Sequence, residues 1–304
     1  MQCHNFNEDW TFEKADQADR LKAFYGNSDA VAVTLPHDAM IREKRDKDCP
    51  SGAQSGFYPG GVYTYEKKFM AQNEWKKQDV FLEFEGIYGI ARVWINGSLA
   101  AVNRNGYMGF SVDLQPWISY EHENIIRIDV DNSKQPNSRW YSGSGIYRDV
   151  NLMIADRLHL VPDSVQLAAI EVEDDQAIIR AKSTIAYTGI GIREITLCTE
   201  LMDAEGNVVA ADEMSVTVEE HSEQEYQQKM YVPNPNRWDA ENPYLYTYRT
   251  YIKENDSVID EETGTFGIRK LQLDTKHGLR VNGKVVKLRG GCIHHDNGII
   301  GTAE

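Results

Sequence analysis

Cysteine is scarce in this chain of 304 residues, and the spacing of the cysteines matches neither a zinc site nor a disulfide framework. The four cysteines lie far apart in the sequence and form no Cys-x-x-Cys pair, at Cys3, Cys49, Cys198 and Cys292. Zinc sites and disulfide frameworks need paired or closely spaced cysteines. The sequence therefore predicts four free thiols.

Long hydrophobic runs are also missing. No stretch reaches the roughly 18 consecutive apolar residues of a membrane-spanning helix. Residues 1–5 lack the apolar region of a signal peptide. We therefore expect no membrane partner, and either a cytoplasmic protein or a periplasmic or secreted one whose leader has been removed.

Positively charged residues are fewer than negatively charged ones: the chain has 32 lysines and arginines and 47 aspartates and glutamates, which give a net charge of −15. A surface this acidic repels phosphate backbones. We expect no nucleic-acid partner.

Helical periodicity of any convincing length is absent from residues 1–156, which instead alternate in short β-rich runs separated by turns. One face of such a run carries Ile146, Val150, Leu152 and Ile154. Asn96-Gly97 between two apolar runs indicates a tight hairpin. Many short strands with punctuated turns predict an all-β jelly roll over 1–156.

Residues 157–268 show evenly spaced alternating runs. About seven strands in about 110 residues is the size of an immunoglobulin-like β-sandwich. We find no group of catalytic residue types there and expect a rigid spacer, with Trp238 in its core.

A third pattern begins at residue 269. Asn282-Gly283 indicates another hairpin, and the run from Val285 to Leu288 predicts a strand that ends at Gly290-Gly291. Beyond it come Cys292, His294, His295 and Asp296. On an extended chain Cys292, His294 and Asp296 share one face, as in a site at a strand end.

Residues 138–150 combine glycines, aromatics and arginine in a second unusual stretch. Trp140 and Tyr141 offer flat faces that could pack on a sugar ring, although we favour a buried core position for Trp140. The Arg139 guanidinium either donates to ligand hydroxyls or pairs with a nearby acid such as Asp131. Both roles of Arg139 stay open.

These stretches resemble glycoside hydrolase family 2, the β-galactosidase and β-glucuronidase family. Residues 138–150 are similar to its Arg-Trp-Tyr-x-Gly-x-Gly-Ile-Tyr-Arg signature, and residues 288–296 resemble its first barrel strand. Gly291 replaces the usual Val, and Cys292 replaces a frequent Asn. The resemblance covers the whole chain. It implies a galactose-binding-like jelly roll (1–156), an immunoglobulin-like sandwich (157–268) and the start of a truncated (β/α)8 barrel (269–304).

The resemblance also implies where the chemistry lies. A retaining glycosidase needs two carboxylates flanking the glycosidic bond, and the family carries both glutamates on later barrel strands. We expect no catalytic residue in this chain and no activity from it alone. His294 matches a histidine that contacts sugar hydroxyls, and we take His294, Arg139 and Asp131 as candidate substrate-binding residues. His295 and Asp296 are expected to support that histidine.

The activity that these features favour is hydrolysis of terminal β-galactosides, with β-glucuronidase and β-mannosidase as relatives in the same family. The alternative is a free-standing carbohydrate-binding or adhesion pair of β-sandwiches. The expected partners are a carbohydrate and the missing barrel domain, and a homo-oligomer stays open. We expect no cofactor and no metal, because Cys292, His294 and Asp296 lack a fourth ligand.

Without its barrel neighbours, the tail after Lys287 is expected to fray or to pair with an exposed strand edge. A Cys292–His294 nucleophile pair is disfavoured because no third group orients it.

Overall fold

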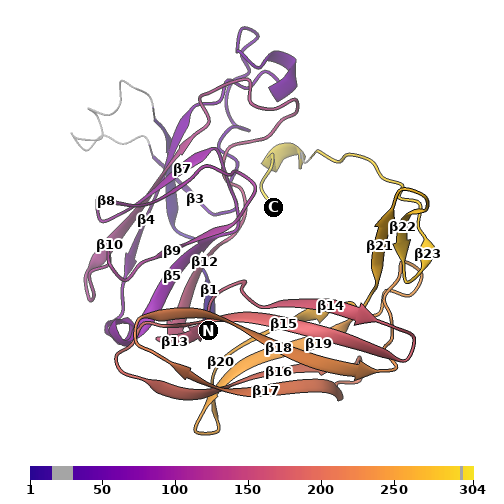
Figure 1. The fold of residues 1–304 in the computed structure, drawn as a ribbon. Coiled ribbons are helices and arrows are strands. Elements are labelled where there is room, and N and C mark those ends of the chain that lie inside the picture. Colours follow the sequence, from indigo (N-terminus) through magenta and orange to yellow (C-terminus); the bar gives the residue numbers. More distant parts are fainter. Residues whose placement is uncertain (16–29, 295–296) are drawn as a thin grey trace. The chain divides into compact units, whose positions relative to one another are not determined.

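The computed structural model describes residues 1–15, 30–294 and 297–304 (Figure 1). They form antiparallel strands with a few short 3-10 turns and divide into two compact units. The first unit comprises Gln2–Ile154 and Cys292–Glu304, and the second comprises Met1 and Ala155–Gly291. The predicted all-β class is confirmed, with sheets consistent with a galactose-binding-like and an immunoglobulin-like sandwich.

Two larger sheets and a short ribbon make up the first unit. The four-stranded sheet runs in the order β1-β12-β5-β9: β1 (Gln2–Asn5), β12 (Val150–Asp156), β5 (Gln78–Phe84) and β9 (Phe110–Asp113). The six-stranded sheet runs β3-β2-β4-β10-β7-β8: β3 (Val31–Val33), β2 (Trp10–Lys14), β4 (Val62–Met70), β10 (Glu123–Asp131), β7 (Ile90–Ile95) and β8 (Ser98–Asn103). The ribbon pairs β6 (Ile87–Tyr88) with β11 (Gly145–Ile146), and the turns are η1 (Gly52–Ser55), η2 (Asn73–Lys77) and η3 (Gly298–Ile300).

Alternation along these strands builds the core of the first unit. In β10, Ile126, Ile128 and Val130 are fully buried, and the residues between them face outward. A strand whose apolar residues share one face must cover that face to remove it from water. The expected face of Ile146, Val150, Leu152 and Ile154 is buried, although residues 147–149 interrupt the strand between β11 and β12.

The second unit contains two four-stranded sheets and a three-stranded one. In the first, β15 (Gln176–Tyr187) pairs with β13 (Leu158–Leu160), β14 (Gln166–Val172) and β18 (Ser222–Pro233). The next runs β17-β16-β19-β20: β17 (Val208–Val218), β16 (Arg193–Met202), β19 (Tyr246–Glu254) and β20 (Ser257–Phe266). The last runs β21-β22-β23: β21 (Leu271–Asp274), β22 (Gly278–Val281) and β23 (Lys284–Val285).

A buried polar cluster crosses the core of the second unit. The Thr199 hydroxyl donates to Oε1 of Gln228 at 2.7 Å and lies 3.0 Å from the Thr250 hydroxyl. Nε2 of Gln228 donates to the carbonyls of Leu197 and Asp212. Because each of these side chains finds partners, burial of the amide carries little penalty.

Both expected Asn-Gly hairpins are present. Asn96 and Gly97 join β7 to β8, and Asn282 and Gly283 join β22 to β23; all four have positive φ. The expected strand at 285–288 is wrong beyond Val285, because β23 ends there and Leu288 is 79% exposed. A strand needs a neighbour for its backbone hydrogen bonds, and among the described residues the pairing ends with the Val286 N–H, which donates to the Leu279 carbonyl at 2.9 Å.

The two expected outcomes for the C-terminal tail were fraying and pairing with an exposed strand edge, and the described residues after Lys287 follow neither throughout. Gly301, Thr302 and Ala303 are buried within the first unit. Trp238 differs from expectation as well. It is half-exposed beneath the Arg269 guanidinium, 4.6 Å from its ring centroid, because it lines a surface hollow of the second unit.

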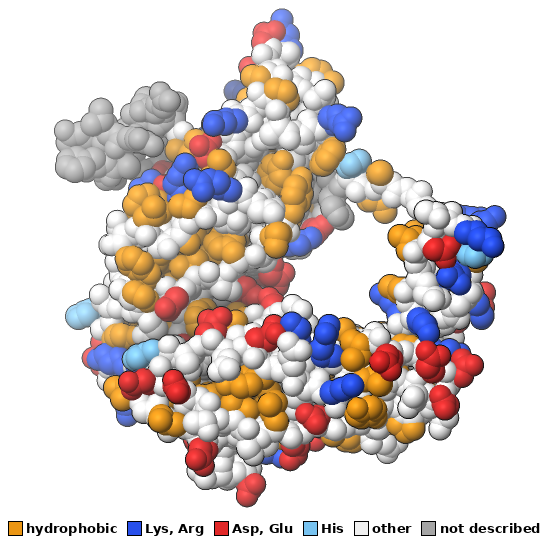
Figure 2. Space-filling view, in the orientation of Figure 1, with side chains coloured by type: hydrophobic (Ala, Val, Ile, Leu, Met, Phe, Trp, Pro, Cys, Tyr) orange, Lys and Arg blue, Asp and Glu red, His pale blue; other side chains and the backbone are white. Residues whose placement is uncertain are grey.

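The four cysteines are free thiols, as predicted. No helix formed by the described residues has the length and hydrophobicity that crossing a bilayer requires. Figure 2 shows acidic and basic side chains interspersed with hydrophobic ones over the face in view.

Candidate functional site

The first half of the signature, residues 138–144, lies in an irregular loop between β10 and β11, and the rest runs through β11 to the start of β12. Arg139 and Trp140 project into solvent, and the expected core position of Trp140 is wrong, because this side chain is 36% exposed. Tyr141 is half-buried, and its hydroxyl donates to Oδ2 of Asp38 at 2.8 Å. The loop therefore turns Trp140 outward while Tyr141 anchors it.

Trp140 contacts one of the residues that the sequence singled out at the C-terminal end. The indole of Trp140 stacks on the imidazole of His294, with ring centroids 4.5 Å apart and planes inclined by 27°. Both side chains are exposed. The fold thus joins the signature loop and the C-terminal motif into one flat aromatic surface of the first unit.

Two tyrosines lie close to this surface. The rings of Tyr88 and Tyr107 pack edge to face with centroids 5.3 Å apart, and Tyr107 is 58% exposed. Partial burial and the neighbouring Tyr88 raise the pKa of Tyr107 to about 12, while a hydrogen bond with Trp140 opposes the rise. The described aromatic surface therefore extends from His294 through Trp140 to the rings of Tyr107 and Tyr88.

Asp131 ends β10 and does not pair with Arg139. Its Oδ1 accepts hydrogen bonds from the Ser133 backbone N–H at 3.1 Å and from the Ser133 hydroxyl at 2.7 Å. Burial acts to raise the pKa of Asp131, but these hydrogen bonds and the charges of Arg92 and Lys134 outweigh it and lower the pKa. The alternative pairing of Arg139 with Asp131 is not among the described contacts, and the hydrogen bonds to Oδ1 of Asp131 come from Ser133.

The three candidate substrate-binding residues differ in how they relate to the stacked pair of Trp140 and His294. His294 stacks on Trp140, and Arg139 is the exposed residue that precedes Trp140 in the chain. Among the described contacts, none links Asp131 to the stacked pair. His295 and Asp296 lie outside the described residues. The expected shared face of Cys292, His294 and Asp296 therefore lies outside them as well, because it includes Asp296.

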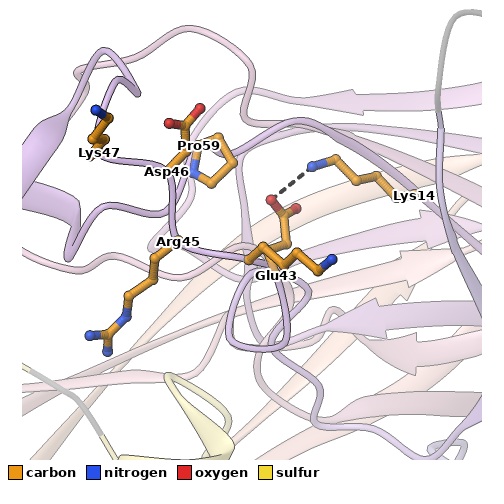
Figure 3. Close-up of a pocket in the computed structure, with 7 residues that line it drawn as sticks. Lys14, Glu43, Arg45, Asp46, Lys47 and Pro59 are labelled. Atoms are coloured by element: carbon orange, nitrogen blue, oxygen red, sulfur yellow. Dashed lines mark ion pairs between the residues drawn. The ribbon is translucent and has the colours of Figure 1, made fainter.

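A surface pocket of the first unit has a different character. It is lined by charged side chains and a proline: Lys14, Glu43, Lys44, Arg45, Asp46, Lys47 and Pro59 (Figure 3). Lys14 pairs with Glu43 at 2.7 Å, and Glu43 also accepts the Tyr63 hydroxyl. The pocket lining contains no aromatic ring that could pack on a sugar, so the exposed aromatic surface is the better candidate site.

Comparison with known families matches most of the chain in two pieces. Residues 10–151 match the description "Glycosyl hydrolase 2 galactose-binding domain-like", and residues 163–269 match "Glycosyl hydrolases family 2". The chain belongs to glycosyl hydrolase family 2. It comprises N-terminal domains of that family, as the two motifs indicated.

Family 2 relatives extend well past the matched region. A β-galactosidase of Bacteroides ovatus is 36% identical over 98% of this chain, which covers 35% of the relative's length. A putative β-glucuronidase of Formosa agariphila is 31% identical over 98% of this chain, which covers 28% of that relative's length. The chain therefore spans about a third of the length of the curated relatives that it matches.

Solved family 2 structures share the fold of the whole chain. A family 2 member from Bacteroides cellulosilyticus is 32% identical with a TM-score of 0.90, covering all of this chain and 40% of that one. A putative β-galactosidase from Bacteroides fragilis is 25% identical with a TM-score of 0.89, covering 46% of that chain.

The sequence assigned no role to one residue that supports the site. Asp38 is 2% exposed and holds both Tyr141 and Thr302, yet it stands alone in the stretch 33–38. Its partners lie more than a hundred residues away, and no local spacing reveals them. The glycines of the loop, such as Gly143, were noted in the sequence, but the residue for which Gly143 leaves room, Asp38, was not.

Proposed function

We propose that this chain forms the sugar-facing N-terminal part of a retaining family 2 glycosidase whose full-length form hydrolyses terminal β-galactosides. The observation that carries the proposal is the Trp140–His294 stack, which unites the two motifs in one surface. Aromatic faces pack on the C–H faces of sugars, and an imidazole and a guanidinium can hydrogen-bond to sugar hydroxyls. The β-galactosidase of B. ovatus, 36% identical, supports this choice of sugar.

In this proposal the chain has three parts. Residues 1–156 form the jelly roll, residues 157–268 form the immunoglobulin-like sandwich, and residues 269–304 begin the barrel. The glutamate acid/base and nucleophile of a retaining glycosidase belong to barrel strands outside this chain, because a barrel of about 250 residues carries its catalytic groups at the ends of several strands. Arg139, His294 and Asp131 remain the proposed sugar contacts, and the first two have the structural support.

A β-glucuronidase is the second candidate function. The exposed guanidinium of Arg139, the residue before Trp140 in the chain, could bind the carboxylate of a glucuronide. The relative in F. agariphila, whose name is putative β-glucuronidase, favours the same choice.

The test compares the full-length enzyme with the 304-residue chain on aryl β-galactoside, β-glucuronide and β-mannoside. We expect turnover of the galactoside by the full-length enzyme and none by the chain alone. Faster turnover of the glucuronide would select the second candidate. Turnover by the repurified 304-residue chain would overturn the assignment of both catalytic carboxylates to the barrel.

A further inference from the structure

The carboxylate of Asp38 is the most heavily hydrogen-bonded acid that the structure describes in the first unit. Its Oδ1 accepts the backbone N–H groups of Met40 at 2.9 Å and Ser144 at 3.2 Å. Its Oδ2 accepts the Tyr141 hydroxyl at 2.8 Å, the Thr302 N–H at 2.9 Å and the Thr302 hydroxyl at 3.1 Å. Burial of a carboxylate costs much less free energy when such donors surround it. Asp38 therefore ties together three segments that are far apart in the sequence.

Two glycines allow these segments to approach. Gly143 and Gly301 have φ values of +64° and +65°. A Cβ on Gly143 would lie 2.0 Å from Oγ1 of Thr302, and a Cβ on Gly301 would lie 2.1 Å from Oδ2 of Asp38. Neither position has room for a side chain.

Polar contacts, rather than the large apolar side chains, hold this end of the chain. Ile299 and Ile300 are 93% and 51% exposed, whereas Thr302 is 7% exposed. The backbone N–H of Glu304 donates to the Tyr147 carbonyl at 3.0 Å. The anchor is therefore centred on the contact between Thr302 and Asp38.

Asn297 closes the anchored segment into a turn. Its backbone N–H donates to the Gly301 carbonyl at 2.7 Å, and its Nδ2 donates to the Ala303 carbonyl at 3.0 Å. These bonds couple position 297 to the residues that Asp38 holds. His294, three residues earlier in the chain, lies on Trp140.

We propose that Asp38 is a positioning residue, which holds the turn at 297–303 and thereby keeps His294 stacked on Trp140. Asp38 is buried and acts through Thr302, without touching a sugar. The value of this arrangement for sugar recognition rests on the proposed function. The structural part, the dependence of the stack on the Asp38 contact, can be measured with no sugar present.

Gly301→Ala and Gly298→Ala make a matched pair of variants of the 304-residue chain. Both glycines have a φ of +65°, but a Cβ on Gly298 meets nothing within 4 Å. Both variants strain the same turn through a positive φ, but Gly301 also has a ψ of −125°, so Gly301→Ala adds backbone strain to its push against Asp38. Asp38→Asn leaves both glycines in place and therefore tests the carboxylate contact without that strain. The readout is the proton NMR signal of the His294 ring, assigned by its loss in His294→Gln. Stacking on an indole shifts this signal upfield.

We expect the His294 signal to move to its unstacked position in Gly301→Ala and to keep its upfield shift in Gly298→Ala. Asp38→Asn should release the turn too, because the amide offers one acceptor oxygen and its NH2 group cannot accept the remaining donors. Hydrogen exchange at 297–303 should accelerate in Asp38→Asn. Circular dichroism shows whether each variant stays folded.

An upfield shift that persists in folded Gly301→Ala overturns the proposal. In the full-length enzyme, Gly301→Ala should raise KM for the aryl galactoside several-fold, while Gly298→Ala should not. Release of His294 without any change in KM would instead overturn its role in sugar binding, and with it the proposed function of this surface. The two failures are therefore distinguishable.

Discussion

Trp140 and His294 stack with ring centroids 4.5 Å apart, although more than 150 positions separate them in the chain. The indole comes from the loop between β10 and β11, and the imidazole from the segment after β23. Their contact links the two stretches, residues 138–150 and 288–296, that carry the resemblance to the family.

Removal of the indole should weaken sugar binding. We expect Trp140→Ala to raise the KM of the full-length enzyme for an aryl β-galactoside about two- to tenfold, because a stacked aromatic contact is worth about 0.5–1.5 kcal/mol. Tyr231→Ala is the control, since this tyrosine is 60% exposed on β18 of the second unit. Equal effects of both substitutions would show that the loss is not specific to the aromatic surface.

Arg139 should act on binding rather than on stability. Its side chain is exposed, so Arg139→Ala should leave the melting temperature nearly unchanged. A lost hydrogen bond to the sugar, worth about 1–3 kcal/mol, should raise KM or lower kcat/KM. Arg127→Ala removes another exposed arginine, paired with Asp129 on β10, and should change neither quantity.

A fall of several degrees in the melting temperature of Arg139→Ala would make this residue structural. A larger loss on the glucuronide than on the galactoside would favour the second candidate function, because only the glucuronide carries a carboxylate for the guanidinium.

Gln228 should matter for the stability of the second unit. Gln228→Leu leaves the Thr199 hydroxyl and the carbonyls of Leu197 and Asp212 without their buried partner. We expect a loss of about 1–3 kcal/mol in the free energy of unfolding, measured by urea denaturation. Gln227→Leu, on the opposite and exposed face of β18, is the control. A similar loss in both variants would contradict a role for the buried cluster.

His37 should make stability depend on pH. Burial, together with Arg42, lowers the pKa of His37 from 6.5 to about 4, against the opposing effect of Asp38. Between these values the unfolded chain binds a proton that the folded chain does not, so stability falls as the pH drops from about 6.5 to about 4. Urea midpoints at pH 7 and pH 5 measure the difference.

His37→Gln should make this pH dependence smaller, and His122→Gln, at an exposed position, should leave it as in the parent chain. An unchanged difference between pH 7 and pH 5 in His37→Gln would assign the effect to another group. The His37 ring also hydrogen-bonds the Tyr65 hydroxyl at 2.9 Å, so His37→Gln can change the stability at every pH. The quantity to compare is therefore the change in stability between pH 7 and pH 5, and not the stability at one pH.

Local sequence determined the all-β class, the two Asn-Gly hairpins and the free thiols. These features follow from alternation, turn chemistry and cysteine spacing, which act over a few residues. The motifs at 138–150 and 288–296 likewise carried enough residue types at fixed spacing to indicate the family. Trp140 shows the limit, because its exposure depends on which way an irregular loop turns, and periodicity does not decide that.

Tertiary structure alone decided which distant residues meet. The sequence offered Asp131 as a partner of Arg139, but the described hydrogen bonds of this carboxylate are local ones, from Ser133 to Oδ1. It also left the tail without an anchor, whereas Asp38 binds Thr302 across 264 positions. Such a contact depends on how the loop that carries Asp38 and the turn that carries Thr302 pack together, and on two glycines that leave room for it. No pattern within either segment encodes the distance between them.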